Sequence, residues 1–254
     1  MRYPLPTLLK ITPLLLLFAT SHGLLGAEPP TLDPSPEQIL SAHRVALTEH
    51  AVIAALRSKD GDIRGSAAQL LAQRQSKAAV PAIERAVRIE REGGVRIAMA
   101  RDLADLNDPV GRKTLTDECY DKSEQGNIRI YAATTMSRDL NDDSCLSYVL
   151  DVLQADGDPK DDGVKEMALD LVPVMINRVD RAQSQKLFEL LTKSLRDPVP
   201  HLRIVASATI SNMGEVRAIP ALQAAIAAET DEGCRDWMKR MLEGLQRGSK
   251  SQQQ

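Results

Sequence analysis

Residues 60–72 read DGDIRGSAAQLLA, and this pattern returns in five later segments of the chain. The later copies are EGGVRIAMARDLA from Glu92, QGNIRIYAATTMS from Gln125, DDGVKEMALDLVP from Asp161, VPHLRIVASATIS from Val199 and DEGCRDWMKRMLE from Asp231. Each copy contains an apolar residue followed directly by a cation (Cys234 is the apolar member in the last), and the pairs are spaced by 32, 33, 36, 38 and 32 residues. A period in this range is typical of stacked supersecondary units.

Each copy predicts one amphipathic helix. The positions four and eight residues after the apolar member are also apolar, beginning with Ala67 and Leu71 in the first copy. Residues with this spacing form one stripe on a helix. Three residues before the apolar member stands an acid or Gln in five copies, as at Asp60, and such a residue is suited to cap a helix N-terminus. The helix of the fourth copy contains Pro173, which should bend or end it near Val172.

A further helix is predicted between successive copies. In AAVPAIERAVR and RAIPALQAAIA, a proline stands in the first helical turn, where its missing N–H does no harm. The stretches KTLTDECYDK, SYVLDVLQA and QKLFELLTKSL occupy the same place in the other units. Each unit is therefore a helical hairpin of about 35 residues that buries its apolar face only against its neighbours.

The pattern D-x-x-[VI]-R-x-x-A-A-x-x-L followed by A-V-P-A-L resembles the HEAT repeat, in particular the short lyase-type HEAT-like subclass. DGDIRGSAAQLL with AAVPAI, and VPHLRIVASATI with RAIPAL, match it best. The resemblance covers roughly residues 45–246. It implies an all-α, right-handed α-solenoid of about five to six repeats, in which the helices that begin at the apolar-basic pairs line the concave face.

The sequence divides into four segments. Residues 1–27 have two early cations, a short apolar run, small residues and no acid, which is typical of a secretory signal peptide. We expect cleavage near Gly23 to Ala27 and a secreted or periplasmic protein without a stable membrane span, although an uncleaved anchor is the alternative. A Pro-rich linker over 28–36, a solenoid over 37–247 with Ser35-Pro36-Glu37 as its start signal, and a disordered tail over 248–254 follow.

The net charge bears on the kind of partner, and the number of cysteines limits the possible disulfides. Loss of residues 1–27 removes two cations and changes the formal charge from −3 to −5, which argues against nucleic acid as the main partner. The chain has three cysteines, so at least one thiol is unpaired. We interpret them as small buried residues, and Cys119–Cys145 is the pair to test as a disulfide.

The recurring cations allow two interpretations. They could form a ladder for an anionic ligand, or each could pair with a carboxylate or a helix-end carbonyl of the adjacent unit and fix the stacking register. The family resemblance favours the second, structural interpretation. The ladder consists of Arg64, Arg96, Arg129, Lys165, Arg203 and Arg235.

A binding strip is predicted on the concave face. Residues two positions after the apolar member point away from the predicted stripe, and isoleucines occur there in consecutive units. Exposed, they would form an apolar strip with a charged rim, suited to a peptide or helix; burial against neighbouring helices is the alternative. The strip would consist of Ile97, Arg101, Ile130, Tyr131, Arg138 and Ile204.

The sequence contains no motif that indicates a catalytic reaction or a metal site. His43 and His50 lie two helical turns apart, but no metal-binding motif, nucleophile motif or phosphate loop occurs, and we predict neither a metal nor a cofactor. The sequence therefore favours an exported, non-catalytic scaffold that binds a protein or peptide on its concave face. The alternative is an enzyme or enzyme accessory of the HEAT-like lyase type that holds a substrate in the groove.

Overall fold

The computed structural model describes residues 34–158 and 162–251, and every regular element in these ranges is helical. The predicted signal peptide and most of the predicted linker lie outside them. An outer row of helices is formed by α2 (Glu49–Ala55), α4 (Val80–Ile89), α6 (Pro109–Tyr120), α8 (Leu146–Gln154), α10 (Arg181–Lys193) and α12 (Ile219–Ala228). An inner row is formed by α3 (Gly61–Gln73), α5 (Gly93–Asp105), α7 (Gly126–Thr134), α9 (Asp162–Met175), α11 (Pro200–Asn212) and α13 (Glu232–Ser251).

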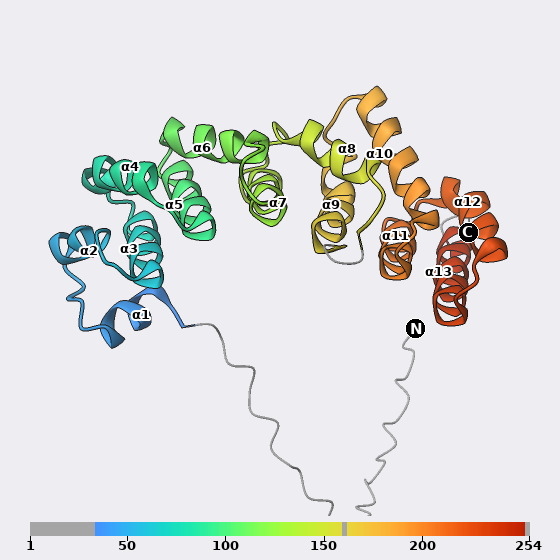
Figure 1. Ribbon diagram of the computed structural model, residues 1–254, viewed down its shortest axis with the longest axis horizontal. Helices are drawn as coiled ribbons and strands as arrows, with labels where there is room; N and C mark the ends of the chain where they lie inside the picture. The colour runs from blue at the N-terminus through green and yellow to red at the C-terminus, as the bar shows by residue number, and fades with distance from the viewer. Residues whose placement is uncertain (1–33, 159–161, 252–254) are drawn as a thin grey trace, which may run out of the picture. The chain divides into compact units, whose positions relative to one another are not determined.

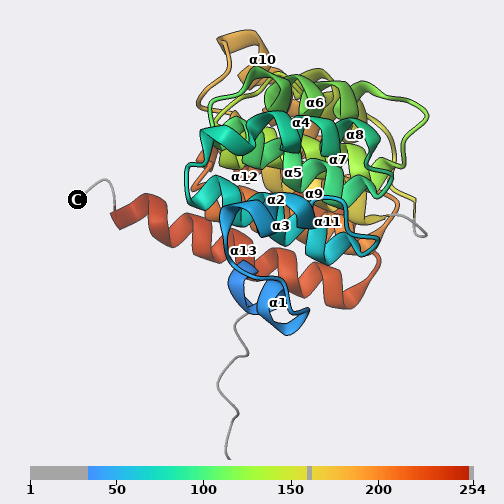
Figure 2. The ribbon, with the colours of Figure 1, turned by 90° about the vertical axis from the view of Figure 1, so that its left-hand side faces the viewer.

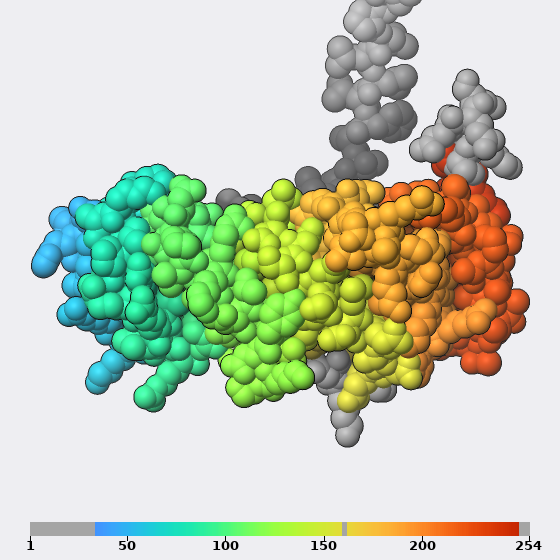
Figure 3. Space-filling view, turned by 90° about the horizontal axis from the view of Figure 1, so that it is seen from above, coloured from blue at the N-terminus to red at the C-terminus, as the bar shows by residue number. Residues whose placement is uncertain are grey.

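The two rows form a curved array within the part of the chain from Ser35 onward. In Figure 1 the inner helices follow the concave side of the arc and the outer helices follow the convex side. α1 (Pro36–Ala42) precedes the first hairpin. Figure 3, which faces the outer row, shows successive segments side by side in chain order. The all-α solenoid expected from the repeats is confirmed, with each apolar-basic pair at the start of an inner helix.

Local sequence signals explain where the helices begin. Ser35 caps α1 in a capping box with Gln38, and Asp60 accepts a hydrogen bond from the Asp62 amide at the start of α3. Asp231 likewise accepts from the amide of Cys234. At Glu92 and Gln125 the side chain makes no capping bond, so these two positions do not cap as predicted.

Two kinds of short helical segment complete the hairpins. Three-residue 3₁₀ turns lead into or follow outer helices: η1 (Lys77–Ala79), η3 (Ser194–Arg196) and η4 (Val216–Ala218). α7 continues as a π-helical segment, η2 (Thr135–Asp139). α9 passes through Pro173 and ends only at Met175, because a proline so near the C-terminus removes few helical bonds.

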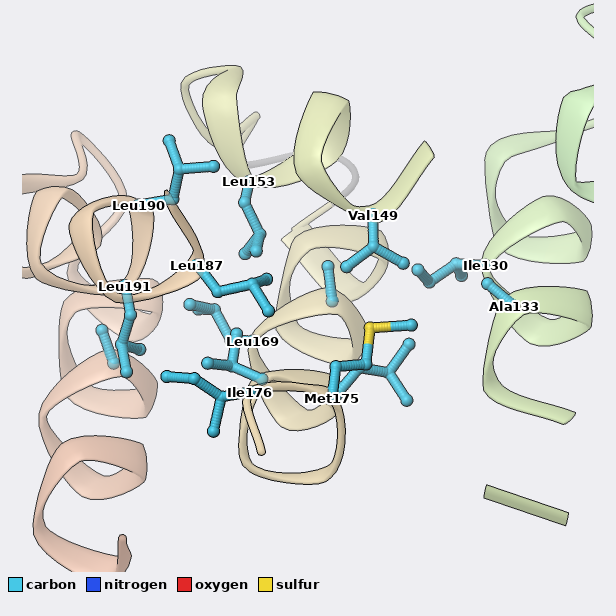
Figure 4. Packing of buried hydrophobic residues seen from close by; sticks show 14 of the residues in the cluster. Ile130, Ala133, Val149, Leu153, Leu169, Met175, Ile176, Leu187, Leu190 and Leu191 are labelled. Atoms are coloured by element: carbon cyan, nitrogen blue, oxygen red, sulfur yellow. The ribbon is translucent and has the colours of Figure 1, made fainter. Parts of the chain in front are cut away.

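The buried residues form two clusters that meet at α5. Met99 and Leu103 belong to the N-terminal cluster, whereas Ile97 and Ala100 belong to the larger cluster that continues to Leu245. α5 therefore contributes one face to each cluster and joins them. Figure 4 shows part of the larger cluster, in which side chains from α7, α8, α9 and α10 converge.

One helix pair packs unusually closely. A Cβ atom added to Gly111 of α6 would lie 2.4 Å from the carbonyl oxygen of Ala100 and 2.5 Å from the amide nitrogen of Ala104, both in α5. Only a glycine permits this approach, because the atoms it meets belong to the backbone.

The cysteines differ from the interpretation as three buried apolar residues. All three are buried, but Cys119 and Cys145 form a disulfide, which links the end of α6 to the residue before α8. Cys234 is a free, buried thiol. α13 also extends to Ser251, so the predicted tail over 248–254 begins too early. No helix within the described residues is both long and apolar enough for a membrane span.

Candidate functional site

Each ladder cation binds a backbone carbonyl at, or one to three residues beyond, the C-terminal end of the helical segment that precedes it. Examples are Arg64 Nη1 to the Ser58 carbonyl at 3.0 Å and Arg203 Nη1 to the Asp197 carbonyl at 2.8 Å. Carbonyls in the last turn of a helix lack intrahelical partners and carry partial negative charge. The ladder cation therefore fixes its inner helix to the outer helix of the same hairpin. In order, the six carbonyls belong to Ser58, Glu90, Cys119, Ala155, Asp197 and Glu229.

Four of the ladder cations also bind a carboxylate of the next repeat. Arg64 binds Glu90, with its Nε 2.6 Å from the carboxylate, and Lys165 Nζ lies 2.6 Å from Asp197. The carboxylates are largely removed from solvent, which makes these pairs stronger than exposed ones. The four acidic partners at these contacts are Glu90 for Arg64, Glu118 for Arg96, Asp197 for Lys165 and Glu229 for Arg203.

Three acids serve two repeats at once. The carboxylate of Glu90 accepts from Arg64, while its backbone carbonyl accepts from Arg96. Glu229 does the same for Arg203 and Arg235. Asp197 is the third acid with this double role, between Lys165 and Arg203. We call the resulting series the ion-pair chain, and at these three junctions it connects one repeat to the next through a single residue.

The ion-pair chain is interrupted at Arg129. No ion pair within the described residues joins Arg129 to a carboxylate; its guanidinium lies 4.1 Å from the ring centroid of Tyr148 in α8. A cation over an aromatic face is attracted by the ring quadrupole. The Arg129 Nε donates to the carbonyl of Cys119, whose sulfur is bonded to Cys145. An aromatic ring and a disulfide thus stand where other repeats have a carboxylate.

The ion pairs shift the pKa values of the acids. Hydrogen bonds from Arg203 lower the pKa of Glu229 to about 2, against a smaller opposing effect of burial. Burial raises the pKa of Glu90, but hydrogen bonds from Arg64 and from two backbone amides outweigh it and hold the pKa below its usual value. Both carboxylates are therefore charged at neutral pH and are satisfied within the fold.

The predicted apolar strip on the concave face does not exist. Ile97 and Ile130 are fully buried, and Ile204 is partly buried against the core. In Figure 4, Ile130 points into the cluster toward Val149. The equivalent Gly65 shows the reason, because a Cβ there would contact Val95 of the next inner helix at 3.9 Å. This side of each inner helix packs against the following repeat.

The other predicted strip residues lie at the surface but are separated. Tyr131 is 40 % exposed, and Arg138 is exposed and donates to the Asp170 carbonyl of α9 at 2.9 Å. Arg101 is half-buried beside Asp102, with Nη2 3.3 Å from a carboxylate oxygen. They are polar or aromatic residues of the open side rather than the rim of an apolar strip.

The open side of the inner row is marked by a different register. Residues one position before the apolar member are exposed in all six repeats, and residues three, six and ten positions after it are mostly exposed or half-exposed. These positions share one helical face, roughly 130° around the helix axis from the centre of the stripe. Large side chains occupy the plus-three position in four successive repeats, and we call them the inner column. They are Tyr131, Met167, Val205 and Trp237.

Of the inner column, the predicted strip contained only Tyr131, because sequence reasoning treated each inner helix as having one buried face. An inner helix contacts the preceding repeat, the following repeat and its outer helix, so only a narrow face stays open. The available signal was the uniformly polar or glycine residue at the minus-one position, as at Asp62, Asn127 and His201.

One buried carboxylate near this face has an oxygen atom without a hydrogen-bond partner among the described residues. Asp102 is 1 % exposed, and its Oδ2 has no hydrogen-bond partner among the described residues. Burial raises the pKa of Asp102 to about 7, and the adjacent Arg101 only partly opposes this effect. In the described ranges, no three His, Cys, Asp or Glu side chains are grouped so that they could hold a metal.

Comparison with known protein families agrees with the repeat architecture over part of the chain. Residues 49–137 match the family described as HEAT repeats. The curated proteins contain no match. A designed armadillo repeat protein in complex with the peptide (KR)4 has 18 % identity and a TM-score of 0.48, over 79 % of this chain and all of that one. The complex of CpcE and CpcF of phycocyanin lyase from Nostoc sp. PCC7120 has 20 % identity and a TM-score of 0.36, over 89 % and 100 %.

Proposed function

Because residues 49–137 match the HEAT repeats, we propose that this chain is a non-catalytic scaffold that binds a segment of a partner protein along its concave face. The inner column carries the proposal. Tyr131, Met167, Val205 and Trp237 lie at the same register of successive inner helices and keep part of their surface open. Aromatic and methionine side chains are enriched at protein interfaces, where they supply a large contact area.

The polar residues beside the inner column suit an extended segment. Thr134, Asp170 and Arg240 stand three positions further along their helices, on the same open face. Arg240 lies over the Trp237 ring, 5.2 Å from its centroid. A strand of partner protein could place apolar side chains on the inner column and hydrogen-bond its polar groups to this second row.

A pair of tyrosines offers a direct test. Tyr131 on the inner row and Tyr120 on the outer row are 40 % and 41 % exposed, so they differ mainly in the face they occupy. Each would be replaced by the photoreactive residue p-benzoylphenylalanine in the full chain, which is then irradiated in its native cells. We expect a protein crosslink from position 131 and none from position 120. A crosslink from position 120 alone would contradict a concave binding face.

We further propose that the scaffold works outside the cytoplasm. The basic start and apolar run of residues 1–27 support export. The disulfide between Cys119 and Cys145 supports the same location, since such bonds persist in oxidising compartments. N-terminal sequencing of the protein from a periplasmic or secreted fraction tests this, and a chain that retains Met1 in the cytoplasmic fraction would contradict it.

A further inference from the structure

A second surface of this molecule lies between two outer helices at the N-terminal end of the array. α2 and α4 lie next to each other at the front of Figure 2, and a groove runs between the C-terminal halves of these helices. Its apolar lining is formed by Ile53, Leu56, Ala82, Ala86 and Ile89. The groove lies on the outer row, away from the inner column.

Ile89 is the exceptional residue of this groove. It is 78 % exposed, which makes it the most exposed large hydrophobic residue in the described part of the chain. Single exposed apolar residues are common on protein surfaces. Ile89, however, continues the apolar lining of a groove, and contiguous exposed apolar surface of this kind marks interaction sites.

Arginines surround the apolar lining. Arg57, Arg85 and Arg88 line the groove together with the apolar residues. Lys59 and Arg91 line the pocket that adjoins it at Ile89, where the two acids, Glu90 and Glu92, are paired with Arg64. Arg88 binds Glu84 within its own helix, but no ion pair of Arg57 or Arg85 is found in the described residues. This cationic cluster belongs to a chain that is acidic overall.

We propose that this groove binds an acidic amphipathic segment of a partner protein. An apolar side chain of the segment enters between Ile53, Ala86 and Ile89, and its carboxylates pair with the arginines at the rim. Arginine is suited to this role because its planar guanidinium binds a carboxylate through two parallel hydrogen bonds. The recessed apolar surface favours an inserted side chain over the flat surface of a membrane, and a helix that lies in a groove is a common recognition mode.

The proposal is tested with the full mature chain and a defined probe. The probe is a short fluorescein-labelled peptide with leucines on one helical face and glutamates on the other; its counterpart has lysines in place of the glutamates. Fluorescence anisotropy is expected to show binding of the glutamate peptide only, with an affinity that falls as salt is raised.

Two variants locate the binding site. Ile89→Asp should weaken binding at least about tenfold, because it removes a large apolar contact and adds a like charge. Arg57→Glu/Arg85→Glu should weaken it by a similar factor. All these side chains are exposed, so the variants should fold, which circular dichroism verifies. Val216→Asp and Arg181→Glu change an exposed apolar residue and an exposed arginine elsewhere, and they should bind as the unchanged chain does.

Other outcomes would overturn the proposal. These are equal binding of the two peptides, or equal binding by the unchanged chain and Ile89→Asp. Vesicles of phosphatidylglycerol and phosphatidylcholine provide a further arm: if Ile89→Asp abolishes vesicle binding but leaves peptide binding unchanged, the surface is a membrane contact. If the unchanged chain is a dimer that Ile89→Asp dissociates, the occupant is a second copy. The concave-face crosslink from position 131 is independent of each of these results.

Discussion

Arg203 and Glu229 form a two-point ion pair in which Nε and Nη2 of the arginine lie 2.6 and 2.7 Å from the two carboxylate oxygens. The side chain of Glu229 is only 3 % exposed. Removal of the arginine would leave this carboxylate buried without its partner, and loss of one partner of a buried pair is strongly destabilising.

Arg203→Met should therefore lower the free energy of unfolding by about 3 kcal/mol. Arg88→Met is the matched control, because Arg88 is exposed and, within the described residues, pairs only with Glu84 four residues earlier in its own helix, and it should change stability by less than about 0.5 kcal/mol. Urea denaturation followed by circular dichroism measures both. Equal losses in the two variants would mean that the ion-pair chain does not hold the repeats together.

The lowered pKa of Glu229 predicts that the protein loses stability in acid. Its pKa is about 2 in the folded chain and near 4.3 in an unfolded one, so the unfolded state takes up the proton first as pH falls. The stabilisation is complete above about pH 4.3 and is lost as the pH falls through about 2. Glu229→Gln should be less stable than the unchanged chain at pH 6, and the difference should shrink by pH 2.5. Urea midpoints at the two pH values provide the measurement.

The raised pKa of Asp102 predicts the opposite trend, in which stability falls as the pH rises. Its pKa is about 7 when folded and near 3.9 when unfolded, so between these values the folded state holds a proton that the unfolded state has lost. Stability from this residue should fall as pH rises from about 4 to 7. Asp102→Asn, which cannot ionise, should be more stable than the unchanged chain at pH 8 by about 1–3 kcal/mol. A pH profile of the melting temperature that is the same in both chains would contradict this assignment.

The close packing of Gly111 against α5 predicts that a larger residue at this position lowers stability through steric contact. Its alanine variant would press a methyl group against the backbone of α5, and overpacking of this kind costs about 1–3 kcal/mol. Gly163 of α9 is the control, since a Cβ there meets no atom within 4 Å. Gly163→Ala should leave stability unchanged or raise it by up to about 1 kcal/mol, because alanine is the better helix former. Thermal denaturation of the two variants compares them directly.

The disulfide predicts a response to reductant. Cys119 and Cys145 are 26 residues apart, and a bond that closes such a loop stabilises by about 2–4 kcal/mol. Cys119→Ser/Cys145→Ser should lose about this amount, and dithiothreitol should destabilise the unchanged chain but not the double variant. If reductant affects both chains alike, the bond is not the source of the stabilisation.

The hairpins and the ladder cations were predictable from sequence because repeated packing requires repeated residues. Every inner helix begins at an apolar-basic pair, since that pair must meet the same surroundings in each unit. The acidic partners were harder to predict. The sequence suggested acids three residues before the apolar member, and Glu92 does bind Arg64, but the shared acids Glu90, Asp197 and Glu229 each stand six residues before a ladder cation.

The open face could not be predicted from a single helix. The predicted strip required Ile97 and Ile130, which lie opposite the apolar stripe, to be exposed; the alternative, burial against neighbouring helices, is what the structure shows. Their burial depends on the next inner helix, which a periodicity within one helix does not contain. The groove at Ile89 has the same origin, because it is formed by two outer helices from different repeats.

The contacts at Arg129 differ from those in the two halves of the array, so the middle of the array responds differently to salt and to reductant. Elsewhere the repeats are coupled by largely buried ion pairs, which salt screens only weakly, whereas the centre combines a disulfide with the more exposed ion pair of Arg112 and Asp142. Around Cys119 and Cys145 the coupling is covalent and indifferent to salt, but a reducing environment would sever it. Reduction would therefore remove one link between α6 and the residue before α8, while the hydrophobic core and the ion pair of Arg112 with Asp142 still hold this joint.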